Sequence, residues 1–385
     1  MEFSTWAYAW DLLDEGVDAV ADRLAGIGVG ELNLATNYHH VQCFHPHNPE
    51  RRTFFARASS YFRPGEGYGR LEPIPFEGMD GDWLADIDDA VADTDLDLTS
   101  WTIGCHNSRL GMANRDATLT TPHGDDLVFG LCPSHPDVQE YLLALLADLD
   151  RRAGFERIEL ETFDYFYGTG FGWHHDKYHT RLGRLGEFLF GLCFCEHCRA
   201  NAREAGVDVE TARADAAAAV DDIAEGRLPH DTDLAGYFAA HPEVRAYAEA
   251  RTETLTDLFG EFADAVDADL GYYAGMLGVE ETWLHGVDMR AAAEHLDYYT
   301  VITYVSSPGE AVERYRTARD IVGDADVELH AGVRPGHPDI HDGATLSAIV
   351  DGLADEGAPR VSFYNYGLLP ERNLDWIGAA TEPHA

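Results

Sequence analysis

Lysine is almost absent from this chain of 385 residues: Lys177 is the only one, and arginine supplies the rest of the 27 basic residues. Against them stand 69 acidic residues, which give a formal net charge of -42. A surface so rich in carboxylates is typical of proteins adapted to high salt, where ions screen their mutual repulsion. The lack of any basic patch argues against a nucleic-acid partner, because phosphate backbones are bound through clusters of Lys and Arg.

Long hydrophobic runs are also missing, so we expect no helix that spans a membrane, which would need about eighteen or more consecutive apolar residues. The acidic N-terminal segment is typical of a strand followed by a helix rather than of a signal peptide. Six cysteines are too few for a secreted disulfide framework. These features predict a cytoplasmic protein, and the sequence is compatible with a homo-oligomer.

Short β-rich runs alternate with longer amphipathic runs along the whole chain, which is typical of βα units. A hydrophobic content of 45% supplies a large core. We predict an α/β fold, a single (β/α)8 barrel over residues 1–385, with a doubly wound sheet as the alternative. The eight expected strands are residues 3–9, 31–36, 96–104, 157–163, 269–275, 298–305, 326–333 and 360–366.

Two long segments interrupt this rhythm and predict functional loops. Residues 38–80 form a polar loop after the second expected strand, and residues 165–240 form an insertion after the fourth. The second segment carries three clustered cysteines.

The cysteine cluster is the motif C-x-C-x-x-C at Cys193, Cys195 and Cys198. Zinc takes four tetrahedral ligands, so a tight loop that supplies three thiolates needs only one more from a distant segment. Cys132 is the first candidate for the fourth ligand, with His135, His197 and the two other cysteines as alternatives. Four thiolates would leave no open position for water, so such a zinc site is structural. Unliganded buried cysteines or a redox pair are the other interpretations.

The order of these motifs resembles that of the family 42 glycoside hydrolases, β-galactosidases with retaining (β/α)8 barrels. A "CPSHP" segment at 132–136 comes first, then Glu161 near the end of the fourth expected strand, then C-x-C-x-x-C. The resemblance covers residues 125–205 and implies that Glu161 is catalytic and that a structural zinc is bound by Cys132, Cys193, Cys195 and Cys198. The chain departs from the family in having Leu160 before Glu161, a longer insertion and no trimerisation domain after the barrel.

Two glutamates alternate on the fourth expected strand, so Glu159 and Glu161 should both point into the barrel, where an unpaired carboxylate is costly. A retaining glycosidase needs one protonated and one ionised carboxyl group about 5 Å apart. We predict Glu161 as acid/base and Glu328, on the seventh expected strand, as nucleophile, with Asp164 in reserve. The alternative is a buried salt-bridge layer of glutamates with Arg157 or Arg334.

Polar and aromatic residues cluster just after the expected strands, where a barrel places its active site. Aromatic rings stack on sugars, and Arg109 and Arg334 could bind a carboxylate, which would indicate an acidic sugar. The predicted substrate-binding residues are Glu159, Asn37, His39, His106, Asn107, Arg109, Trp173, His174, His175, Tyr304, His330, Arg334, Tyr364 and Asn365.

These observations predict a glycoside hydrolase that acts on a small glycoside or oligosaccharide, by a retaining mechanism with two carboxylates. A metal-dependent hydrolase or isomerase that uses His174, His175 and His179 is one alternative. A sugar-binding barrel without activity is the other, because a barrel fold does not by itself determine chemistry.

Overall fold

The computed structural model describes residues 1–152, 154–165 and 177–384. Eight parallel strands close into a barrel in the order β1, β2, β6, β9, β10, β11, β12, β13, and β13 pairs with β1 again. Their bounds are β1 Glu2–Tyr8, β2 Glu31–Tyr38, β6 Asp97–Ile103, β9 Arg157–Glu161, β10 Asp269–Ala274, β11 Tyr298–Ile302, β12 Glu328–Val333 and β13 Arg360–Phe363. The predicted (β/α)8 barrel is confirmed.

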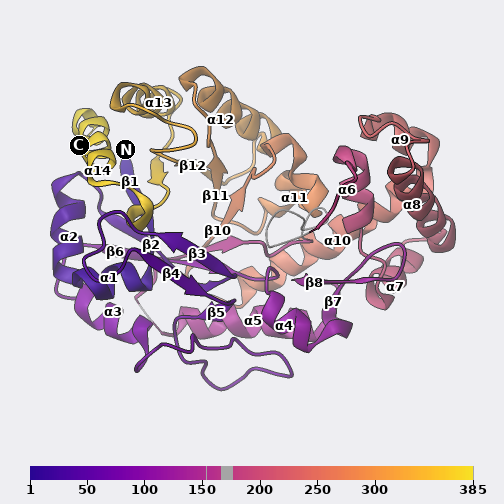
Figure 1. Ribbon diagram of the computed structural model, residues 1–385, viewed down its shortest axis with the longest axis horizontal. Coiled ribbons are helices and arrows are strands. Elements are labelled where there is room, and N and C mark those ends of the chain that lie inside the picture. Colours follow the sequence, from indigo (N-terminus) through magenta and orange to yellow (C-terminus); the bar gives the residue numbers. More distant parts are fainter. Residues whose placement is uncertain (153, 166–176, 385) are drawn as a thin grey trace.

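Helices cover the outside of the barrel, between and after the strands (Figure 1). Aspartate accepts hydrogen bonds from the free backbone N–H groups at several helix starts, as Asp82 does for α3 and Asp342 for α13. The covering helices are α1 Ala9–Glu15, α2 Val17–Gly26, α3 Trp83–Val91, α4 Ser108–Ala113, α5 Pro136–Asp150, α10 Pro242–Asp264, α11 Met289–Ala292, α12 Pro308–Val322, α13 Gly343–Asp355 and α14 Glu371–Thr381.

Three long connections carry additional structure. The connection after β2 contains the antiparallel hairpin β3 Val41–Phe44 and β4 Thr53–Ala56, then β5 Ser59–Ser60, which pairs with β2. A second hairpin, β7 Thr118–Thr120 with β8 Asp126–Leu131, precedes α5. Between β9 and β10 the chain forms α6 Gly183–Gly191, α7 Glu196–Glu204, α8 Val209–Ala224 and α9 Leu234–Ala240, beside the barrel (Figure 1).

Charged side chains form ion pairs at the amino ends of the barrel strands. Glu31 pairs with Arg157 at 3.1 Å and with Arg360, and Arg360 also pairs with Glu2. The side chains of Glu31 and Arg360 are buried, so each charge depends on the other. The alternative prediction of a buried salt-bridge layer made by Glu159, Glu161 and Glu328 is therefore wrong, because the acid that pairs with Arg157 is Glu31, at the end of the barrel opposite to Glu161.

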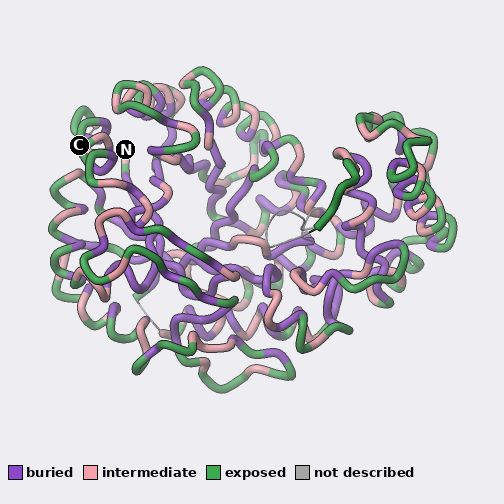
Figure 2. Tube along the Cα trace, viewed as in Figure 1, coloured by how far each residue is buried: buried purple, intermediate pink, exposed green. Residues whose placement is uncertain are grey.

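The barrel strands are buried, whereas the outer faces of the surrounding helices are exposed (Figure 2). No helix in the described part of the chain combines the length and hydrophobicity that crossing a bilayer requires.

Candidate active site and metal centre

Glu161 is the last residue of β9 and lies at the carboxyl end of the barrel. It contributes to the wall of a cavity of about 820 Å³, which is lined by the carboxyl ends of barrel strands and by the segments that follow them. The indole N–H of Trp101, on the neighbouring strand β6, donates a hydrogen bond of 2.7 Å to Oε2 of Glu161. This arrangement places a half-buried carboxyl group where a barrel presents its reactive side chains.

Burial raises the pKa of Glu161 to about 8. The hydrogen bond from Trp101 acts in the opposite direction, and the nearby charges of Glu159 and Asp164 raise the pKa further. Glu161 is therefore mostly protonated at neutral pH. A carboxyl group that keeps its proton at neutral pH can serve as a general acid.

Glu159 lies two residues earlier on β9, deeper in the barrel, and is fully buried. It accepts hydrogen bonds from Trp6 Nε1 at 2.7 Å, from Asn33 Nδ2 at 3.0 Å and from the hydroxyl of Thr300. Burial raises its pKa, against these three hydrogen bonds. Glu159 does not line the cavity, so its position suits holding β9 against β1, β2 and β11 rather than binding a substrate.

Tyrosine hydroxyl groups gather around the cavity. Tyr273 and Tyr304 share a hydrogen bond of 2.7 Å, and Tyr8 and Tyr364 share one of 3.4 Å. Burial raises the pKa of all four, so they stay neutral and can both donate and accept hydrogen bonds. The aromatic lining consists of Tyr8, Tyr38, Phe44, Trp101, Tyr273, Tyr304 and Tyr364.

Asp164 lies just beyond β9 and lines a small adjoining cavity of about 30 Å³ together with Glu161. It is buried, accepts a hydrogen bond of 2.5 Å from the hydroxyl of Tyr272, and lies 3.3 Å from Nδ1 of His285. Between the two acids, Thr162 has a φ of 53°. A β-branched residue rarely adopts this left-handed conformation, and such strain is concentrated at functional sites.

Glu328 requires a correction. It is the first residue of β12, is 65% exposed and pairs with Nε2 of His330 at 3.0 Å. Because the barrel strands are parallel, it lies at the mouth opposite to Glu161, with Glu2 and Arg157 nearby. The strand rises roughly 16 Å over the five steps to its carboxyl end. Glu328 therefore cannot act together with Glu161.

His330 also lies on the lower part of β12, where its ring stacks on Tyr298 with centroids 4.4 Å apart. Burial lowers the pKa of His330 to about 4, so it is neutral at neutral pH. It does not line the large cavity, and its predicted role in substrate binding is not supported by its position.

Four other predicted residues have structural contacts instead. Asn37 donates to the carbonyl of Ile103 at 2.6 Å, Asn107 caps α4, and Arg109 pairs with Glu77 at 2.9 Å. His106 is buried, and the centroid of its ring lies 4.6 Å from the ring centroid of His39. None of the four lines the large cavity.

Of the predicted binding residues, five line the cavity: His39, Tyr304, Arg334, Tyr364 and Asn365. Trp173, His174 and His175 lie outside the described residues, and His179 is exposed. Tyr8, Tyr38, Tyr273, Arg314 and Arg372 also line the cavity but were not predicted. Strand alternation could have identified two of them, because residues two apart on a strand share a face. Tyr8 lies two residues after the inward Trp6, and Tyr273 lies two residues after Gly271, which pairs with Glu159 on the neighbouring strand.

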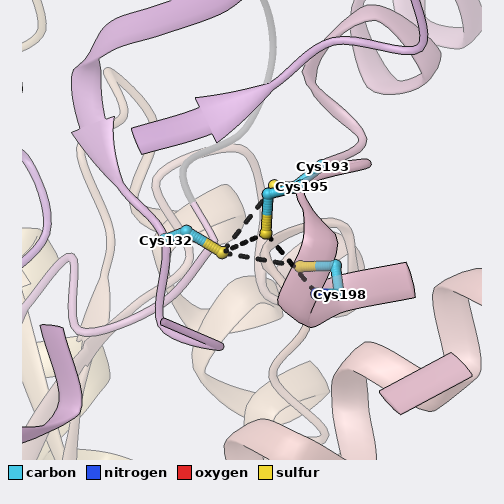
Figure 3. A group of neighbouring side chains, drawn as sticks. All are labelled: Cys132, Cys193, Cys195 and Cys198. Atoms are coloured by element: carbon cyan, nitrogen blue, oxygen red, sulfur yellow. Dashed lines mark hydrogen bonds between the residues drawn. The ribbon is translucent and has the colours of Figure 1, made fainter. Parts of the chain in front are cut away.

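The four predicted metal ligands come together (Figure 3). Their ligand atoms all lie within 4.8 Å of one another, and Cys132 Sγ is 3.6, 3.5 and 3.7 Å from those of Cys195, Cys198 and Cys193. A tetrahedron of thiolates around zinc has edges of about 3.8 Å, from a Zn–S distance of about 2.3 Å. The spacing thus fits a metal ion.

The surroundings of the cluster also suit bound thiolates. All four cysteines are buried, and none is in a disulfide. The backbone N–H of Thr120 donates to Cys193 Sγ at 3.3 Å, and that of Cys198 donates to Cys195 Sγ at 3.4 Å. The cluster joins the segment after β8 to the first turn of α7 and to the connection that precedes it, and none of its residues lines either cavity beside Glu161.

No protein-family model and no curated protein matches the chain. Solved structures resemble it. α-L-Fucosidase isoenzyme 2 from Paenibacillus thiaminolyticus has a TM-score of 0.57 at 12% identity, and the alignment covers 100% of this chain and 49% of the fucosidase chain. The β-galactosidase from the psychrophilic Marinomonas ef1 has a TM-score of 0.59 at 11% identity, and the alignment covers 99% of this chain and 59% of the galactosidase chain. The PgaB (BpsB) glycoside hydrolase domain from Bordetella bronchiseptica has a TM-score of 0.53 at 13% identity, and the alignment covers 100% of this chain and 96% of that domain.

These three neighbours are glycoside hydrolases, and at 11–13% identity the likeness shows the fold. The chain spans about half the length of the fucosidase and about three fifths of the galactosidase. The resemblance to family 42 in particular stays a prediction.

The raised pKa of Glu161 predicts a pH-dependent difference in stability between the wild type and Glu161→Gln. Below about pH 4.5 the carboxyl group is neutral in both folded and unfolded chains. Between there and about pH 8 the unfolded chain loses the proton that the folded chain keeps, so the free energy of unfolding of the wild type falls relative to Glu161→Gln.

Guanidinium chloride denaturation of both proteins across this pH range measures the difference between their free energies of unfolding. The contributions of the other titrating groups are common to both proteins and cancel in this difference. A difference that does not change with pH would show that the Glu161 carboxyl group is not perturbed.

Proposed function

We propose that the chain is a glycoside hydrolase in which Glu161 is the general acid. The observation that carries the proposal is a carboxyl group that burial keeps protonated at neutral pH, in the wall of a large cavity at the carboxyl end of the barrel. The barrel fold shared with three glycoside hydrolases supports it.

In the proposed reaction a sugar ring binds against the aromatic wall of the cavity, with its hydroxyl groups bonded to tyrosine hydroxyls. Glu161 gives its proton to the leaving glycosidic oxygen while the C–O bond to the sugar breaks, which leaves Glu161 as a carboxylate. The N–H of Trp101 holds the carboxyl group in place and stabilises the charge that then develops on it.

We further propose Asp164 as the second carboxylate. Among the described residues it is the other acid that lines a cavity with Glu161. Its oxygens face the Tyr272 hydroxyl and His285 Nδ1, which fix its orientation. In a retaining mechanism Asp164 attacks the anomeric carbon as the bond to the leaving oxygen breaks. Water, which gives a proton to the Glu161 carboxylate, then displaces Asp164 and completes the hydrolysis.

The role of Glu161 is tested by how the loss of activity in Glu161→Gln depends on the leaving group of the substrate. We expect Glu161→Gln to lose about 100-fold or more in kcat on alkyl glycosides and disaccharides, whose leaving oxygen needs a proton. The loss should be much smaller on dinitrophenyl glycosides, whose leaving group departs as an anion. The measurement is steady-state hydrolysis in molar KCl of a panel that includes galactosides, glucosides, fucosides and uronides.

Glu328→Gln is the matched control, because it removes a glutamate of the same barrel at the opposite mouth, and it should hydrolyse the panel as the wild type does. Equal losses on good and poor leaving groups would remove Glu161 as the general acid. A wild type with no activity on any member of the panel would reject the glycosidase proposal.

For the metal centre we propose that the four cysteines bind zinc and that the site is structural. Four thiolates complete the tetrahedron and leave no position for water, and the cluster lies away from the proposed active site. Bound metal would fasten the β8–α5 connection to α7, two segments about 60 residues apart in sequence.

Removing one thiolate should release the metal. We expect about one zinc ion per wild-type chain and little in Cys198→Ser, with a lower midpoint of thermal unfolding for the variant. Elemental analysis of purified proteins measures this, and Cys105→Ala, which removes an equally buried thiol outside the cluster, should keep the metal. Equal metal content in wild type and Cys198→Ser would reject the assignment.

A further inference from the structure

We propose that the substrate of the large cavity is an anionic glycoside, whose carboxylate or sulfate group is bound by Arg314, Arg334 and Arg372. This inference rests on the proposed function, because it names the substrate class of the same site.

The charge of the cavity is the reverse of the charge of the chain. The whole sequence has 69 acidic and 27 basic residues, but the described residues that line the cavity include three arginines and a single acid, Glu161. Since Glu161 is mostly protonated at neutral pH, no carboxylate among the described lining residues offsets the arginines. A cluster of cations at this place in so acidic a protein is best explained by an anionic ligand.

The three arginines share one wall. Arg314 belongs to α12, Arg334 follows β12 and Arg372 belongs to α14, and these elements follow the adjacent strands β11, β12 and β13. Glu161 and Trp101 come from the other half of the barrel, on β9 and β6. A sugar between the two halves could thus present its glycosidic oxygen to Glu161 and its anionic group to the arginine wall.

The arginines keep hydrogen-bond donors for a ligand. Arg314 pairs with Glu310 at 3.1 Å, and Arg334 pairs with Asp339, but neither of these two acids lines the cavity. Each guanidinium group has five donors in a planar fork, so one acid leaves several of them unused. Arg372 has no carboxylate partner among the described residues, and its Nε donates only a long hydrogen bond of 3.4 Å to Asn373.

Two further features suit an anion at this wall. The Arg334 guanidinium carbon lies 4.7 Å from the ring centroid of Tyr304, which together with Asp339 fixes its orientation before a ligand binds. Asn365 also lines the cavity and is buried, and its Nδ2 has no acceptor among the described residues. A ligand oxygen would satisfy this donor after a shift of the side chain, because Nδ2 itself is not exposed to the cavity.

Short-range contacts matter more here than attraction from a distance. The net charge of -42 repels anionic sugars, and at molar salt ions screen charges beyond roughly 3 Å. Selection must therefore come from direct hydrogen bonds between guanidinium groups and the anion, for which arginine is better suited than lysine.

Binding to Glu161→Gln tests the inference without requiring turnover. Calorimetry would compare the methyl glucuronides and methyl galacturonides, in both anomeric forms, with the corresponding methyl glucosides and galactosides. We expect a uronide to bind about tenfold or more tightly than its neutral partner, the worth of a charge-assisted hydrogen bond. Galactose 6-sulfate glycosides form a second arm, and tighter binding there would identify the anion as sulfate.

Arg372→Gln and Arg334→Gln, each added to Glu161→Gln, should reduce this preference about tenfold. Arg316→Gln is the matched control, because Arg316 belongs to the same helix as Arg314 but is exposed and pairs with Glu356 outside the cavity. Circular dichroism spectra would check that each variant is folded.

The outcomes separate this inference from the proposed function. Uronide or sulfate binding without hydrolysis by the wild type would support the anionic ligand and reject the glycosidase. Hydrolysis of neutral glycosides, with no preference for anionic ones, would support the glycosidase and overturn the anionic substrate. No binding of any anionic probe, or a preference that survives both arginine substitutions, would also overturn it.

Discussion

The burial of carboxyl groups inside the barrel is the constraint on which the rest of this structure depends. Three acids point inward at three depths, and each is stabilised in a different way. Glu31 forms ion pairs with Arg157 and Arg360, and Glu159 accepts three hydrogen bonds. Among the described residues Glu161 has one hydrogen bond, from Trp101, so burial keeps its proton on. The acid with the fewest partners is thus the one that reaches the cavity, and its poor stabilisation as an anion makes it useful as an acid.

The fold could be predicted from the sequence because its local signals agree. Each barrel strand is a short β-rich run between amphipathic helices, and the observed strands lie within a few residues of the expected ones. The cluster of four cysteines could also be predicted, because C-x-C-x-x-C leaves one metal ligand to be found and Cys132 precedes a helix start. Alternation along β9 likewise placed Glu159 and Glu161 on one face.

The site was less predictable, because it depends on depth in the barrel and on which loops meet. Glu328 has the residue type and the strand of a nucleophile, but β12 begins at this residue, so it lies at the wrong end. Asn37, Asn107 and Arg109 have the composition of a binding site, yet they bond to the backbone, a helix start and Glu77. Arg314 and Arg372 lie on helices after the last strands, where no local pattern distinguishes them from surface arginines.

The central claim is that Glu161 holds a proton in neutral solution, and infrared difference spectroscopy measures it most directly. The carbonyl band of a protonated carboxyl group, obtained as wild type minus Glu161→Gln, would be followed as a function of pH. The account predicts that this band disappears with a midpoint near pH 8. A midpoint near the usual glutamate value, about 4.3, would show that Glu161 is an ordinary carboxylate at neutral pH and would contradict the account.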